Sequence, residues 1–78
     1  MLAKKVTVYS TRTCPWCDRA KNYLRSKNVD FEELDVANDP EALGEMIRLS
    51  NQMGVPVITV DDEVIVGFDR QRLDALLN

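Results

Sequence analysis

The only two cysteines in the sequence, Cys14 and Cys17, enclose Pro15 and Trp16. Thiols one helical turn apart can close a disulfide with each other, and a thiolate can open a disulfide in another molecule. A disulfide across so short a loop adds little to the stability of a folded chain. The pair therefore predicts redox chemistry rather than a structural crosslink.

The residues around the pair predict a strand, a loop and a helix. Lys5–Ser10 is rich in β-branched and aromatic residues and predicts a buried strand, which a short polar loop joins to a helix from Pro15 to about Asn28. Proline suits a first helical position, so Cys14 is expected at or just before the helix N-terminus. Cys17 falls on the apolar face of this helix.

This placement predicts different roles for the two thiols. The N–H groups and dipole at a helix N-terminus favour an anion, so we expect a lowered pKa at Cys14 and a thiolate that attacks a substrate disulfide. Cys17, one turn deeper and less exposed, is expected to resolve the mixed disulfide by attacking the Cys14 sulfur.

The rest of the chain predicts five more elements without a linker or repeat. Leu34 and Val36 mark the apolar face of the next strand, and Asp69 is expected to cap the last helix. The next segments are a strand at Val29–Val36 and a helix from Pro40 to about Asn51, which Asp39 caps and whose buried stripe is Leu43, Met46, Ile47 and Ser50. They are followed by a hairpin, in which the strands Val57–Val60 and Val64–Val66 enclose residues 61–63. The last helix has an apolar face of Leu73, Leu76 and Leu77. The order β-α-β-α-β-β-α predicts one α/β domain, residues 1–78, with helices covering a mixed sheet.

Composition and charge exclude several classes of function. The net charge is −3, so nucleic acid is not an expected partner. No apolar stretch approaches membrane-spanning length, and the first strand leaves no room for a signal peptide, so we expect a soluble, cytoplasmic protein without a membrane partner. Residues 1–27 nevertheless carry a net charge of +6. Within them, Arg12 and Arg19 flank the cysteines, where they either favour a thiolate, attract an acidic ligand, or are simply solvated.

Three other uses of the cysteines compete with redox chemistry. A zinc site needs about four ligands, and the chain has no histidine and no third cysteine. Inert core cysteines are common, but a helix N-terminus beside proline and tryptophan is not an ordinary core position. A third alternative is a binding module in which two chains share an iron–sulfur cluster through their Cys14 thiolates.

Two further features indicate a binding surface. Trp16, the only tryptophan, is expected to point outward and to contact a partner or ligand, although its ring could instead lie flat over neighbouring side chains. Val55-Pro56 stands at the entrance of the third strand. A trans bond is the ordinary expectation there, whereas a cis bond would turn the Val55 backbone outward as a free edge for a partner chain.

These features together resemble the glutaredoxins. Cys14-Pro15-Trp16-Cys17 is similar to the glutaredoxin Cys-Pro-Tyr-Cys pattern, and Val55-Pro56 and Gly67 stand where that family has Val-Pro and a glycine before the last helix. The resemblance implies a thioredoxin fold with a four-stranded mixed sheet flanked by three helices. It also implies that Cys14 is the nucleophile, Cys17 the resolving thiol and Pro56 a cis proline facing them, with backbone groups of Val55 binding the cysteine part of glutathione.

The rest of the glutathione site departs from that pattern. A lysine of that pattern is replaced by Thr11, a threonine by Gly54, a Gly-Gly pair by Gly67-Phe68 and an aspartate by Gln71. Three polar residues, Arg12, Gln52 and Asp69, are near enough to substitute. Gly-Phe is instead similar to short redoxins that take electrons from thioredoxin reductase and supply ribonucleotide reductase, although those usually lack a proline at position 15 and have Arg-Pro-Asp after Gly-Phe.

The predicted function is therefore a monomeric dithiol thiol-disulfide oxidoreductase and electron carrier that reduces protein or glutathione-mixed disulfides. We expect no bound cofactor or metal. The electron donor stays open between glutathione and thioredoxin reductase. The substrate-binding residues expected beside the two cysteines are Arg12, Trp16, Val55, Pro56, Gly67, Phe68 and Asp69.

Overall fold

The computed structural model describes residues 5–77. Lys4, one of the positive charges in the +6 of residues 1–27, lies outside the described residues. Four strands and three helices follow one another in the expected order within this range. Their bounds are β1 Val6–Ser10, α1 Pro15–Ser26, β2 Glu32–Asp35, α2 Pro40–Ser50, β3 Val57–Val60, β4 Glu63–Val66 and α3 Arg70–Leu77. The predicted α/β class and element order are confirmed. No helix in residues 5–77 is long and apolar enough to cross a membrane.

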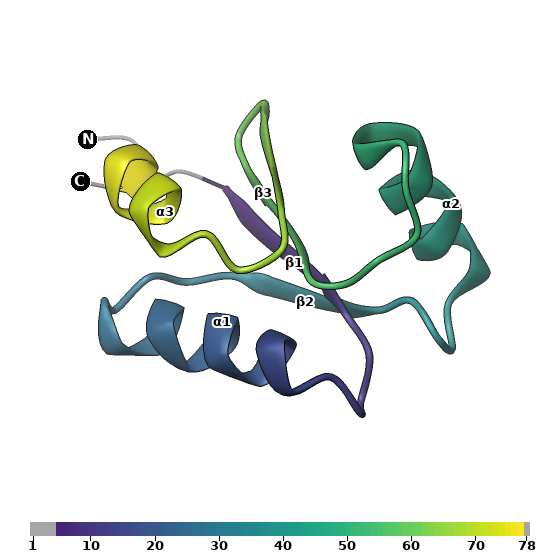
Figure 1. Ribbon diagram of the computed structural model, residues 1–78, viewed down its shortest axis with the longest axis horizontal. Helices are drawn as coiled ribbons and strands as arrows, with labels where there is room; N and C mark the ends of the chain where they lie inside the picture. The colour runs from purple at the N-terminus through teal and green to yellow at the C-terminus, as the bar shows by residue number, and fades with distance from the viewer. Residues whose placement is uncertain (1–4, 78) are drawn as a thin grey trace.

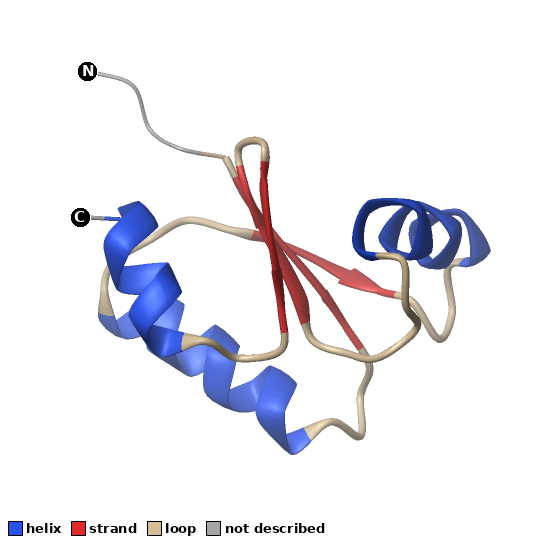
Figure 2. Ribbon diagram, turned by 45° about the horizontal axis from the view of Figure 1, so that its top comes forward, coloured by secondary structure: helices blue, strands red, loops and turns tan. Residues whose placement is uncertain are grey.

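The strands form one mixed sheet in the order β2-β1-β3-β4. β1 pairs in parallel with β2 and antiparallel with β3, and β4 completes the hairpin with β3. Helices α1 and α3 lie on one face of this sheet and α2 lies on the other (Figures 1 and 2). The sheet with its three helices is the layered arrangement that the sequence predicted.

The alternation of side chains along β1 and β3 creates two apolar layers. Val8 and Ile58 point to the α1 and α3 side, where they pack in a buried cluster with Ala20, Leu24 and Leu73. The cluster on the α2 side is built from Tyr9, Val36, Ala42, Met46 and Val57. Both faces of the short sheet are therefore covered, and the loops at its edge are left to form a site.

The second strand is shorter than predicted because the residues before it end α1 instead. The N–H of Val29 donates to the carbonyl of Leu24 at 3.0 Å, and Asn28 has a left-handed φ of 57°. This geometry is typical of a helix C-terminus, so α1 ends at Ser26 rather than near Asn28. Pairing with β1 begins only at Glu32.

Two smaller predictions also need correction. Glu63 pairs with Val60 and belongs to β4, so only two residues remain in the hairpin turn. On α2, Met46 is the one member of the predicted stripe that is buried, whereas Leu43, Ile47 and Ser50 are half-buried and Ala42 is buried instead. The predicted caps are confirmed. The carboxylate of Asp39 accepts the N–H groups of Glu41 and Ala42, and that of Asp69 accepts the N–H of Arg72.

Candidate active site

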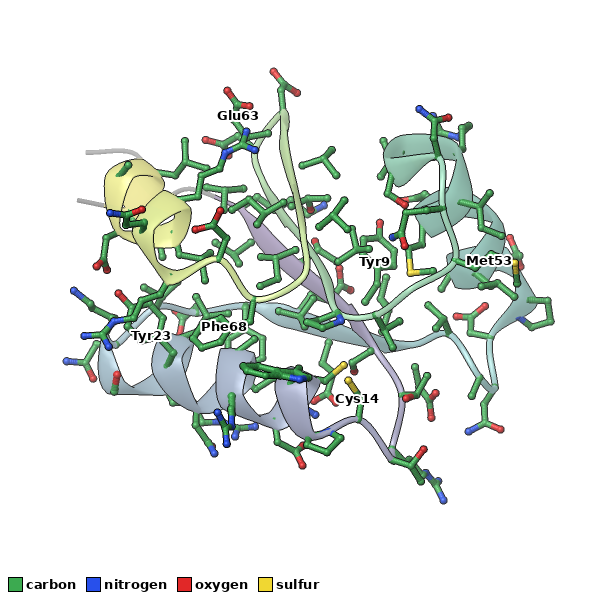
Figure 3. All side chains as sticks on the ribbon, viewed as in Figure 1. Tyr9, Cys14, Tyr23, Met53, Glu63 and Phe68 are labelled. Atoms are coloured by element: carbon green, nitrogen blue, oxygen red, sulfur yellow. The ribbon has the colours of Figure 1, made fainter. Side chains whose placement is uncertain are left out.

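Cys14 is the N-cap residue of α1, the position that the sequence predicted. Its backbone is extended, with φ −108° and ψ 104°, and Pro15 follows as the first helical residue. The N–H of Cys17 donates a hydrogen bond to the Cys14 sulfur at 3.1 Å. A donated hydrogen bond stabilises negative charge on the sulfur that accepts it. Cys14 is half-buried, and Figure 3 shows it at the first turn of the helix.

Cys17 lies one turn deeper and is fully buried. Burial is the largest of the effects that raise the pKa of its thiol above the ordinary value, and the neighbouring Cys14 raises that pKa further. The backbone N–H of Thr11 and the charge of Lys21 act in the opposite direction. Both cysteines are free thiols in this structure. The pair thus combines a thiol that substrate can reach with one that substrate cannot reach.

The loop before β3 completes the site opposite Cys14. The Val55-Pro56 peptide bond is cis, as the family resemblance implied, and Pro56 is buried. The Cys14 thiol lies 3.9 Å from the carbonyl oxygen of Val55, to which it can donate. The N–H of Gly67 donates to the carbonyl of Pro56 at 2.8 Å, which ties the start of the α3 loop to this strand.

An open cavity of about 310 Å³ lies between these segments. It is lined by Trp16, Val55, Pro56, Gly67 and Phe68, which come from the start of α1, the loop before β3 and the loop after β4. Residues far apart in the sequence therefore meet at one groove, and five of the predicted site residues share it. No charged side chain lines this cavity within the part of the chain that the structure describes.

Trp16 is 56% exposed at the mouth of this groove. The guanidinium of Arg19 lies 4.7 Å from the centre of its ring, a cation–π contact that holds the indole in place. Phe68, which also lines the groove, is half-buried with its ring 5.7 Å from that of Tyr23. In Figure 3, Phe68 lies over the same helix whose first turn carries Cys14.

The structure does not bring Arg12 and Asp69 into this groove. Arg12 is highly exposed and pairs loosely with Asp35, with 3.8 Å between the charged atoms. Asp69 is used as the cap of α3. Gln52, which could have replaced a glutathione-binding residue, bonds instead within its own loop to Gly54. Arg12, Asp69 and Gln52 are close to the site in the sequence, but their polar contacts are made outside the groove.

A charged cluster beside Cys17 was not predicted. Lys21 on α1 forms an ion pair with Glu33 on β2 at 2.7 Å, and the buried hydroxyl of Ser10 donates to the same carboxylate at 3.3 Å. Spacing could have revealed only one part of this cluster, because Lys21 follows Cys17 by four residues and so lies next to it on the helix.

Among the described residues, no third metal-binding side chain joins the two cysteines. Within residues 5–77, no three side chains of histidine, cysteine, aspartate or glutamate lie close enough together to hold a metal ion. Any cluster bound through Cys14 would need ligands from outside these residues.

Comparison with known proteins identifies the family. The sequence profile of the glutaredoxins matches residues 6–65. The chain belongs to the glutaredoxin family. It is 50% identical over 72 residues to an uncharacterized glutaredoxin-like 8.6 kDa protein in the rubredoxin operon of Clostridium pasteurianum, a match that covers 92% of this chain and 96% of that one.

Solved glutaredoxin structures share the fold. The glutaredoxin of Archaeoglobus fulgidus superposes with a TM-score of 0.85 at 26% identity, over 96% of this chain and 87% of that one. The glutaredoxin-like NrdH-redoxin of Escherichia coli, described as having a thioredoxin-like activity profile, gives a TM-score of 0.81 at 28% identity, over 92% and 93%. This glutaredoxin thus has the predicted thioredoxin fold and is a member of a family of thiol oxidoreductases.

Proposed function

We propose that this glutaredoxin is a dithiol thiol-disulfide oxidoreductase that reduces protein disulfides and glutathione-mixed disulfides. One observation carries the proposal. The accessible Cys14 sulfur sits at the N-cap of α1, accepts the N–H of Cys17 at 3.1 Å, and has the buried Cys17 thiol as its neighbour. An accessible nucleophile with an internal resolving thiol is what reduction of a disulfide in two steps requires.

The reaction has two displacements. The Cys14 thiolate attacks one sulfur of the substrate disulfide, which forms a mixed disulfide and releases the other substrate sulfur as a thiolate. Cys17 then loses its proton and attacks the Cys14 sulfur, which closes the Cys14–Cys17 disulfide and releases the second thiolate. The substrate gains two electrons and the protein loses two, and an external thiol or reductase then restores the dithiol.

The groove beside Cys14 fits an extended substrate segment. Its lining includes the apolar side chains of Trp16 and Phe68 and the Val55 residue whose carbonyl oxygen lies 3.9 Å from the Cys14 thiol. A substrate chain passing between the two aromatic side chains would bring its own disulfide to Cys14. Such a site selects a substrate segment by its shape and apolar side chains more than by its charge.

A second candidate concerns the electron donor. Glutathione carries two carboxylates, and none of the described residues lining the cavity has a cationic side chain. The apolar walls, together with the structural likeness to the NrdH-redoxin of Escherichia coli and its thioredoxin-like activity profile, favour a thioredoxin reductase as donor. The Gly67-Phe68 pair, similar to that of short redoxins that supply ribonucleotide reductase, favours a ribonucleotide reductase among the substrates. We propose that this chemistry takes place in the cytoplasm with a monomeric protein.

The test is to oxidise the protein and follow its reduction by two donor systems at equal concentration. One reaction contains glutathione, glutathione reductase and NADPH, and the other contains thioredoxin reductase and NADPH. Catalytic NADPH consumption with a disulfide substrate in either system supports the oxidoreductase, and the faster system names the donor. Consumption in neither system, with iron and visible absorbance in anaerobically purified protein, would favour the iron–sulfur alternative instead.

A further inference from the structure

The ammonium of Lys21 is unusually well enclosed for a lysine on a short helix. Its side chain is only 12% exposed, against 42% for Glu33, with which it pairs at 2.7 Å. Asp18 contacts the same ammonium from the solvent side at 3.6 Å. A lysine fixed in this way keeps its positive charge at one place, because the ion pairs restrict its otherwise flexible stem.

The carboxylate that holds Lys21 is itself fixed to the sheet. Glu33 pairs in register with Val8 of β1, and side chains of paired residues share a face, so Glu33 lies on the face that α1 covers. The buried hydroxyl of Ser10, at the end of β1, donates to Glu33 at 3.3 Å. The charge is thus positioned by three elements, α1, β1 and β2.

Cys17 is the functional group next to this charge. Lys21 is four residues beyond Cys17 on α1, and residues at that spacing are neighbours on a helix surface. Both side chains face the sheet rather than solvent. Coulomb attraction between a thiolate and an ammonium is stronger here than in water, because the buried surroundings have a lower dielectric constant.

We infer that Lys21 is a positioning residue for the resolving step, in which its fixed charge stabilises the Cys17 thiolate that attacks the mixed disulfide. The inference rests on the proposed function and concerns only its second displacement. Cys17 gives up its proton to solvent, its thiolate attacks the Cys14 sulfur, and the substrate thiolate leaves. Lys21 forms no bond in this sequence and acts only through its charge.

The electrostatic surroundings of Cys17 support this assignment. Burial and Cys14 raise the pKa of Cys17, whereas the N–H of Thr11 and the charge of Lys21 lower it. Glu33 neutralises part of the lysine charge, and Asp18 contacts Lys21 from solvent. Removal of Lys21 should therefore raise the pKa of Cys17, while removal of the Glu33 charge should lower it.

The experiment uses an aromatic disulfide with a chromophoric thiol, mixed with the full-length reduced protein in a stopped-flow instrument. The first burst of chromophore reports attack by Cys14, and the second equal burst reports resolution by Cys17. The rate of the second burst is measured against pH for the wild type, Lys21→Met and Glu33→Gln. Lys27→Met is the control, because it removes one positive charge near the far end of the same helix, where Lys27 pairs with Asp74.

We expect the pH midpoint of the second burst to rise in Lys21→Met and to fall in Glu33→Gln. At a pH below the midpoint, the rate should change about threefold for each pH unit by which the midpoint moves, because greater nucleophilicity partly offsets a smaller thiolate fraction. Lys27→Met should match the wild type. Opposite changes in the two midpoints cannot arise from loosening of the fold, which would affect both variants in the same direction.

Midpoints that move in the same direction, or that do not move in either variant, would overturn the inference. If Lys21→Met does not fold, Glu33→Gln keeps the inference testable, because the side-chain amide oxygen can still accept from the Lys21 ammonium and a midpoint that does not fall contradicts the role. Absence of the first burst in the wild type would instead count against the proposed function itself.

Discussion

The N–H of Cys17 donates a hydrogen bond to the sulfur of Cys14 across 3.1 Å, so the resolving residue also solvates the attacking one. This single contact follows from the N-cap position of Cys14, where the first helical N–H groups have no partner within the helix. The helix thereby holds the backbone of Cys17 against the sulfur of Cys14. The division of roles between them follows from burial, because Cys14 is half-buried and Cys17 fully buried.

Loss of the Trp16 side chain should weaken recognition of protein substrates. The ring is 56% exposed and lines the groove, so Trp16→Ala should change stability by no more than about 0.5 kcal/mol. We expect KM for a protein disulfide to rise severalfold while the rate with a small aromatic disulfide stays near that of the wild type. Steady-state kinetics with both substrates provides the measurement.

Val66→Ala is the matched control for that substitution. Val66 is exposed to a similar degree, 54%, but does not line the groove. Its KM should stay unchanged with both substrates. Equal losses in Trp16→Ala and Val66→Ala would show that the groove does not bind the partner.

Two glycine substitutions should change stability in opposite directions. Gly67 has a φ of +81°, which an alanine adopts only at a cost of about 1 kcal/mol, so Gly67→Ala should destabilise the protein by that amount. Gly44 lies within α2, and nothing lies within 4 Å of an added Cβ, so Gly44→Ala should stabilise by about 1 kcal/mol. Urea unfolding curves of the two variants measure both effects, and a Gly67→Ala variant as stable as wild type would contradict the strain assigned there.

The Lys21–Glu33 pair should make stability depend on pH in acid. The bond from Lys21 lowers the pKa of Glu33, so its contribution is complete above the ordinary glutamate pKa and is lost as pH falls through the lowered value. Glu33→Gln should therefore cost about 1 kcal/mol at pH 7, a modest value because the carboxylate is partly exposed. Urea unfolding from pH 7 to about pH 3 should show this difference shrinking.

Glu32→Gln separates the ion pair from a general charge effect. Glu32 is the neighbouring residue of β2, and it forms none of the ion pairs found among residues 5–77. Its substitution should leave stability within about 0.5 kcal/mol of wild type at every pH. A Glu33→Gln difference that stayed constant from pH 7 into acid would rule out the linkage.

Local sequence patterns were enough to predict most of the fold. Strands β1 and β3 have short apolar runs, and the capping residues Asp39 and Asp69 mark helix starts that the structure confirms. Predictions failed where tertiary contacts override a pattern. Val29 and Phe31 are apolar enough to suggest a strand, yet they pack against the α1 side of the core from a connecting segment.

The site was predictable only where its residues have a sequence signature. Cys14 and Cys17 are recognisable by their spacing. Val55 and Pro56 stand out as a proline at a strand entrance and through the family resemblance, and Phe68 only through the resemblance. Arg12 was chosen for its closeness in sequence, but its side chain extends toward Asp35. The Lys21–Glu33 contact could not be predicted from sequence, because it depends on how α1 packs over β2.

Trapping of the mixed disulfide tests the central claim most directly. Cys14→Ser, Cys17→Ser and wild-type protein are each incubated with a disulfide-containing substrate and examined by intact mass spectrometry under non-reducing conditions. We predict that Cys17→Ser accumulates a covalent adduct with one half of the substrate, that Cys14→Ser forms none, and that the wild type ends as the internal disulfide with reduced substrate. An adduct on Cys17 in the Cys14→Ser protein, or substrate reduction by that variant at the wild-type rate, would contradict the account.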